Sequence, residues 1–129
     1  MPHKAISGLE REVMEVLWEV EKATVRQVMN RLDSAKSRAY TTIMTTVDRL
    51  FQKNLLTRER EGNAYVYSPK QDRDTYWKEI AQETMSNLLN VSGDVALTAF
   101  VDAASQEDEK NLERLEQLIL SHRNRRGSQ

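Results

Sequence analysis

Residues 39–50, AYTTIMTTVDRL, bring four threonines together within six positions. These are Thr41, Thr42, Thr45 and Thr46. Ile43, Val47 and Leu50 fall at i, i+4 and i+7, the apolar seam of an amphipathic helix. Threonine is a poor helix former, by roughly 0.5 kcal/mol relative to alanine, so its use on a helix calls for another reason. Its hydroxyl donates and accepts hydrogen bonds, and its methyl group makes apolar contacts. This chemistry suits binding.

Residues that commonly carry out catalysis are sparse. The two histidines, His3 and His122, lie near opposite ends of the sequence, so neither a histidine-based triad nor a histidine metal cluster is expected. The four glycines form no phosphate-cradling loop. The chain contains no cysteine, which excludes disulfides, thiolate metal sites and a cysteine nucleophile. We therefore expect no enzyme activity, no cofactor and no metal.

Length and composition indicate one domain, or one small domain with a helical appendage. The 129 residues are 39% hydrophobic and 30% charged, so the core is expected to be thin and to be completed by association with another copy. No apolar run approaches the roughly 20 residues that a membrane span needs, and no signal peptide is visible. We expect a cytoplasmic protein without membrane insertion.

Charge is unevenly distributed along the chain. Residues 22–70 carry ten basic and four acidic groups, a net charge of +6, whereas the segments before and after carry −3 and −4. The formal net charge of −1 hides this basic block. Such a block indicates an anion-binding face, although a chance distribution over a mixed surface remains an alternative.

Two helices are predicted before the threonine segment. Ser7 followed by Glu10 is a capping-box pattern at the start of the first. Thr24 followed by Gln27 is the same pattern at the start of the second. Apolar residues then recur on one face of each helix.

The polar residues 33–37 are expected to form the turn before the threonine helix, which we place at 39–53. Asn54 follows, a residue suited to the left-handed conformation that ends helices. Three short helices, the last two joined by a short polar turn, predict a helix-turn-helix.

The next segment has the pattern of a β-hairpin. Residues 55–61 and 64–67 flank the turn dipeptide Gly62-Asn63. Arg58 and Arg60 share a face of the first strand, and the hairpin must lie against the helices to be stable. The predicted fold is mainly α, a winged helix-turn-helix over residues 1–70 followed by a C-terminal helical region over 71–129.

Several motifs resemble the penicillinase-repressor (BlaI/MecI) family across roughly residues 6–120. They are Glu12-Val13-Met14 with Leu17-Trp18, Ala39 to Thr45 with Arg49-Leu50 and Lys53, and Ala64 to Pro69. Asn54 departs from the glycine common in the family. The resemblance implies a dimeric transcriptional repressor that binds inverted-repeat operators in double-stranded DNA. It also implies release when a membrane-bound sensor protease triggers cleavage in the C-terminal region.

DNA binding would explain why threonines are used on this helix. Their hydroxyls can contact phosphates and base edges, and their methyl groups can contact thymine methyls in the major groove. Their stiff side chains lose little entropy on docking. Thr46 is expected to face the core instead. The predicted DNA-binding residues are Arg26, Tyr40, Thr41, Thr42, Met44, Thr45, Arg49, Lys53, Arg58 and Arg60. Arg26, Arg49 and Lys53 are expected at phosphates, and Met44 at thymine methyls.

Residues 71–129 lack the basic bias and carry apolar stripes that have no obvious partner in their own chain. A break is predicted at 90–94, and Ser105 with Asp108 is expected to open the last helix. We expect this region to form a homodimer, with a monomeric appendage as the alternative. The predicted dimerisation residues are Trp77, Ile80, Leu88, Phe100, Leu112, Leu115 and Ile119.

By position, the family's cleavage site corresponds to Ala99-Phe100, where alanine replaces the usual asparagine. This bond is the candidate cleavage site. The absence of cysteine argues against the copper-responsive relatives. The alternative function is a winged-helix adaptor for protein contacts without specific DNA binding, which the salt dependence of DNA binding would distinguish.

Overall fold

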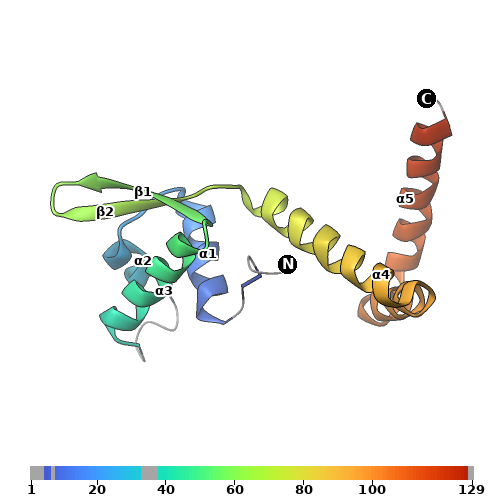
Figure 1. Cartoon of the computed structure of the whole chain (residues 1–129), viewed down its shortest axis with the longest axis horizontal. Helices are drawn as coiled ribbons and strands as arrows, with labels where there is room; N and C mark the ends of the chain where they lie inside the picture. The colour runs from blue at the N-terminus through green and yellow to red at the C-terminus, as the bar shows by residue number, and fades with distance from the viewer. Residues whose placement is uncertain (1–4, 7, 33–37, 128–129) are drawn as a thin grey trace. The chain divides into compact units, whose positions relative to one another are not determined.

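The computed structural model describes residues 5–6, 8–32 and 38–127 and divides into two compact units, Met1–Glu83 and Thr84–Gln129. Figure 1 shows the elements in chain order. They are α1 (Leu9–Val20), α2 (Val25–Arg31), α3 (Tyr40–Gln52), β1 (Leu56–Glu61), β2 (Ala64–Pro69), α4 (Arg73–Glu107) and α5 (Lys110–Gly127). The mainly α winged-helix fold predicted from the sequence is confirmed.

The capping box predicted for the second helix is present. The Thr24 side chain accepts from the Gln27 backbone N–H at 3.1 Å, and the Gln27 side chain accepts from the Thr24 N–H at 2.9 Å. The N-cap of α1 is Gly8, with a positive φ of 58° that favours glycine. The predicted cap Ser7 and the predicted turn 33–37 lie outside the described residues.

The threonine helix forms as expected. Ile43, Val47 and Leu50 are fully buried, and Asn54 adopts the predicted left-handed conformation with φ 66°. The Leu55 N–H donates to the Leu50 carbonyl at 3.1 Å, the bond that closes a helix ending of this kind. α3 is thereby terminated where β1 must begin.

The hairpin pairs antiparallel, with Arg58 opposite Tyr67 and Arg60 opposite Tyr65. Its turn residue Gly62 has φ 63°. The predicted strands are shifted slightly, because β1 begins at Leu56 and β2 continues to Pro69. Ala23 and Tyr67 exchange backbone hydrogen bonds of 3.0 and 2.8 Å, which attach the wing to the segment between α1 and α2.

The core lies in the first unit, where α1 packs against α2, α3 and β2. Tyr76, in the first turn of α4, is only 1% exposed and belongs to this core, and Trp77 and Ile80 pack partly buried against it. The expectation that these stripes have no partner in their own chain is therefore wrong for the start of α4. A dimer role for Trp77 and Ile80 stays a prediction.

A break between helices was predicted at residues 90–94. The structure has instead a kink within α4 at Ser92, whose φ is −154° and ψ is 69°. Ser105 lies inside α4 and does not open the next helix. α5 begins at Lys110, whose backbone N–H donates to the Asp108 carboxylate at 2.9 Å. None of residues 84–127 is buried.

In the part of the chain that the structure describes, no helix has the length and apolar character required to cross a membrane.

Candidate nucleic-acid interface

The outward face of α3 carries most of the predicted base contacts. Thr41, Thr42 and Thr45 are exposed, and Met44 is 44% exposed although it is large and apolar. Thr46 is buried, as predicted, and its hydroxyl donates to the Thr42 carbonyl at 2.8 Å. The exposed threonines thus leave their hydroxyls on the surface opposite the core.

One edge of this face is bordered by Arg26 from α2. Its guanidinium carbon lies 4.7 Å from the ring centroid of Tyr40, at the first position of α3. Stacking on an aromatic ring orients a guanidinium and leaves the N–H groups in the guanidinium plane available to an acceptor. The structure thus brings together two predicted DNA-binding residues from neighbouring helices.

The other edge is bordered by the wing. The guanidinium carbon of Arg58 lies 4.0 Å from the ring centroid of Phe51 in α3 and 4.2 Å from that of Tyr65 in β2. Its Nη1 atom is 3.8 Å from the Asp48 carboxylate. Arg60, further along the same strand, lies 5.6 Å from the Tyr65 ring. Arg58 therefore connects the wing to α3, a contact the sequence reasoning did not include.

Lys53 is less available than predicted. Its ammonium group donates to both oxygens of Glu10 in α1, at 2.9 and 3.0 Å. The Lys53 side chain is 29% exposed and that of Glu10 is 14% exposed. A phosphate contact by Lys53 would require the ammonium to leave this carboxylate, whereas Arg49, one turn earlier, is exposed.

Asp48 was predicted to face outward with Thr41 and Thr45, but its pairing with Arg58 was not predicted. The other partners of the basic side chains, which the sequence analysis did not identify, are Phe51, Tyr65 and Glu10. Phe51 was detectable in principle, because its spacing on the helix sets it beside the predicted face. The contacts from Tyr65 and Glu10 cross between elements, so they depend on tertiary packing.

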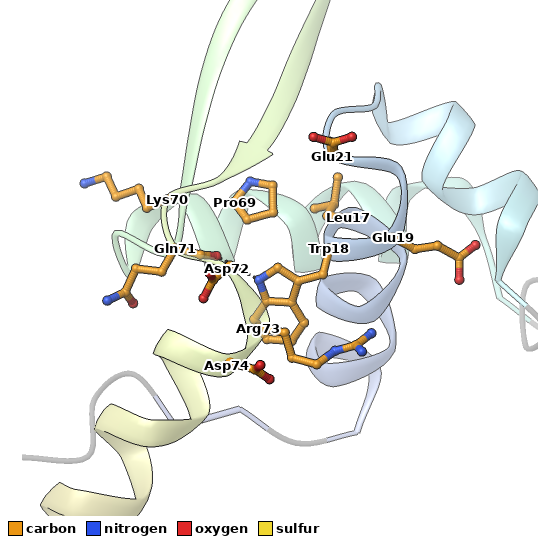
Figure 2. A pocket seen from close by; sticks show the side chains of 10 residues that line it. All are labelled: Leu17, Trp18, Glu19, Glu21, Pro69, Lys70, Gln71, Asp72, Arg73 and Asp74. Atoms are coloured by element: carbon orange, nitrogen blue, oxygen red, sulfur yellow. Dashed lines mark hydrogen bonds between the residues drawn. The ribbon is translucent and has the colours of Figure 1, made fainter.

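A polar hollow of about 680 Å³ lies where α1 and the start of α4 meet (Figure 2). Trp18 lines this hollow, and its indole N–H donates to the Gln71 carbonyl at 2.9 Å. Arg73 lies over the Trp18 ring at 5.9 Å and pairs with Glu15. Hydrogen bonds from the Thr75 side chain and backbone hold the pKa of the nearby Asp72 below its ordinary value of 3.8. These contacts anchor the start of α4 on α1.

Several predicted dimerisation residues lie on exposed apolar surface of the second unit. Leu88 is 50% exposed, Phe100 43%, Leu112 37% and Ile119 51%. Leu115 is half-buried. An apolar groove of about 400 Å³ lies along the kinked part of α4 and is lined by Met85, Leu88, Val91, Ser92, Val95, Ala96, Ala99 and Phe100.

The candidate cleavage bond, Ala99-Phe100, lies in the interior of α4 with both side chains exposed. In the part of the chain that the structure describes, no group of three or more His, Asp or Glu side chains could hold a metal ion.

Three helices closed by a two-stranded wing, with a threonine-rich third helix facing outward, define a winged helix-turn-helix protein. The sequence model of the penicillinase repressor family matches residues 6–121. The chain therefore belongs to the penicillinase-repressor family, as the sequence motifs indicated.

Similar proteins carry matching descriptions. The chain is 35% identical to the transcriptional regulator BlaI of Mycobacterium tuberculosis, with 93% of this chain and 89% of that protein covered. It is 26% identical to a penicillinase repressor of Bacillus licheniformis, with 94% of each covered. A solution structure of monomeric Bacillus licheniformis BlaI in complex with the blaP half-operator is 33% identical, with a TM-score of 0.46, and covers 54% of this chain and 85% of that one.

Proposed function

We propose that this protein is a transcriptional repressor that binds inverted-repeat operators in double-stranded DNA as a homodimer, in the cytoplasm and without a catalytic step. The observation that carries the proposal is the exposed threonine face of α3, bordered by Arg26 on one side and by the wing arginines on the other. Polar and methyl groups suited to base edges lie between cations suited to phosphates. The family membership of the chain supports the same function.

The dimer is supported by the exposed apolar side chains of the second unit. No described residue after 83 is buried, while Val91 is 83% exposed and Val95 is 70% exposed. Apolar surface left in water favours association by about 25 cal/mol per Å² removed. A second copy covering this surface would bring two α3 helices to two half-sites. Light scattering at micromolar concentration tests this, and a mass near the 15.0 kDa of one chain would contradict it.

Release is proposed to follow a signal from a membrane-bound sensor protease, with Ala99-Phe100 as the candidate bond. Because this bond lies inside α4, a protease must first open the helix locally. The side chains of Ala99 and Phe100 are exposed within one chain, and none of residues 84–127 is buried, which favours such opening.

Selection of bound duplexes from random DNA is the deciding experiment. We expect an enriched motif with two-fold symmetry and half-site centres separated by whole helical turns, roughly 10 base pairs each. A dimer touching about eight phosphates should bind with log affinity falling against log salt at a slope near −7. A flat salt response without an enriched motif would contradict DNA recognition and favour the protein-binding adaptor.

A further inference from the structure

Asp48 occupies an unexpected place for a negative charge. It is the one acidic residue in the sequence of α3, and Thr41, Thr45 and Asp48 follow each other at i, i+4 and i+7. This spacing sets the three side chains along one line of the helix, opposite the fully buried Leu50. The Asp48 side chain is 54% exposed. A carboxylate therefore lies on the face proposed to enter the major groove, on the side next to the wing.

An acidic group here would be repelled by DNA phosphates unless a cation compensates its charge. Arg58 supplies that cation from the wing, with Nη1 3.8 Å from the carboxylate. The Phe51 and Tyr65 rings, 4.0 and 4.2 Å from the guanidinium carbon, hold it in place. A guanidinium stacked on rings keeps its N–H groups in plane and free to face an acceptor, which a lysine ammonium does not reproduce.

The bases differ in what they present to a carboxylate. Cytosine presents only an amino donor in the major groove, whereas adenine pairs its donor with an adjacent acceptor. Guanine presents two acceptors, and thymine presents an acceptor and a methyl group. A carboxylate held on the recognition face therefore favours cytosine and disfavours guanine at the position it contacts.

We propose that Asp48 is a specificity-determining residue that accepts a hydrogen bond from the amino group of a cytosine at one position in each half-site. Arg58 is the positioning residue that orients the carboxylate and offsets its charge. This inference rests on the proposed function and names one part of its base recognition.

The test is selection from random duplexes with the full chain and three variants. Wild type should enrich one cytosine per half-site by about tenfold over the other bases, within the range of a single base contact. Asp48→Ala should lose that preference. Asp48→Asn should shift it to adenine, because an asparagine amide pairs with the donor and acceptor of adenine. Asp74→Asn removes the same charge from the start of α4 and should select the wild-type motif.

A second pair of variants tests the positioning role. Arg58→Lys keeps the charge but loses the stacked, planar geometry, so the cytosine preference should fall at least threefold while the salt slope stays unchanged. Arg31→Lys makes the same exchange at an exposed position of α2 whose guanidinium pairs with Glu19, and it should leave the preference intact. In an Asp48→Ala background, Arg58→Lys should have no further effect on that position, as expected when the two residues act as a unit.

The outcomes separate this inference from the proposed function. If Asp48→Asn and Asp48→Ala enrich the same motif as wild type, the role of Asp48 is overturned while specific DNA binding stands. If Arg58→Lys leaves the cytosine preference unchanged, the positioning role of Arg58 is overturned. If wild type enriches no motif, the proposed function fails and this inference fails with it.

Discussion

At the scale of single residues, the basic side chains divide by the contacts they already make. Arg26 and Arg58 stack on aromatic rings, and Lys53 is paired with Glu10, whereas Arg49 is exposed on the flank of α3. The same formal charge therefore has different uses at different positions. Two substitutions on α3 and one at Lys53 separate these uses.

Thr45→Val and Arg49→Ala should affect DNA binding in different ways. Valine keeps the shape and removes the hydroxyl, so we expect a changed base preference at one or two positions per half-site, worth roughly 1–3 kcal/mol each. Arg49→Ala should weaken binding to all sequences alike, because a phosphate contact carries no sequence information. Selection from random DNA and salt titrations measure both. An unchanged motif for Thr45→Val would show that this face does not contact bases.

Lys53→Ala should lower stability rather than DNA affinity. It would leave the Glu10 carboxylate, only 14% exposed, without its cation, at a cost of about 1–2 kcal/mol. Urea denaturation measures the loss, and Lys78→Ala, at an exposed position of α4, is the control. The double variant Glu10→Ala with Lys53→Ala should recover part of the loss. Unchanged stability with a salt slope reduced by about one unit would instead indicate a phosphate contact.

At the scale of elements, Tyr76 ties α4 to the winged helix, and burial raises its pKa to about 12, with the negative charge of Glu10 adding to the rise. The unfolded chain should release this proton near the ordinary value of 10.0, while the folded chain keeps it. The contribution of Tyr76 to the free energy of unfolding is therefore fully present below pH 10. It should be lost as the pH rises from 10 toward 12, a loss of about 2 kcal/mol.

Tyr76→Phe removes this titration. Denaturant unfolding at pH 9 and pH 11 should show wild type losing more stability than Tyr76→Phe between the two values. Tyr65→Phe, at a 38% exposed position on the wing, should follow wild type. Parallel losses in wild type and Tyr76→Phe would mean that Tyr76 titrates alike in the folded and unfolded chains.

The elements themselves were largely predictable from local signals. The capping pair Thr24 and Gln27 and the left-handed Asn54 appear where the sequence placed them, because caps and turns depend on neighbouring residues. The packing of Tyr76 on the core was missed, since periodicity shows that a face is apolar but not what covers it. For the same reason the Glu10–Lys53 pair, 43 positions apart, could not be predicted.

At the scale of the whole molecule, the two units differ in how they can be stabilised. The first unit buries a continuous core that includes α1, α2, α3 and both strands. The second unit buries no described residue, so its stability within a single chain depends on the helices alone. Loss of the second unit should therefore affect the proposed dimer more than the folding of the winged helix.

A fragment of residues 1–99 should fold, keep its half-site preference and lose at least tenfold in affinity for the full inverted repeat. When one domain of a linked pair is bound, the second meets its half-site at an effective concentration of about 1 mM. With a half-site Kd on the order of 10 μM, the linkage contributes on the order of 100-fold, about 2.7 kcal/mol. The fragment lacks Phe100, Val101 and α5, which carry exposed apolar residues.

Titrating fragment and full-length protein against one duplex measures the difference, and a duplex with a single half-site is the control. Equal affinity for the full repeat would place the dimer contacts before residue 100. Cleavage at Ala99-Phe100 could then not act as the switch.

The aromatic cluster at the start of α4 gives the protein an optical probe of its own. The chain has two tryptophans, Trp18 and Trp77, and their ring centroids lie 6.4 Å apart, beside Tyr76. Intrinsic fluorescence excited at the indole band therefore reports on one place, the junction of α1 and α4. A change in emission on DNA binding, without unfolding, would mean that contact at α3 changes the surroundings of the first turns of α4.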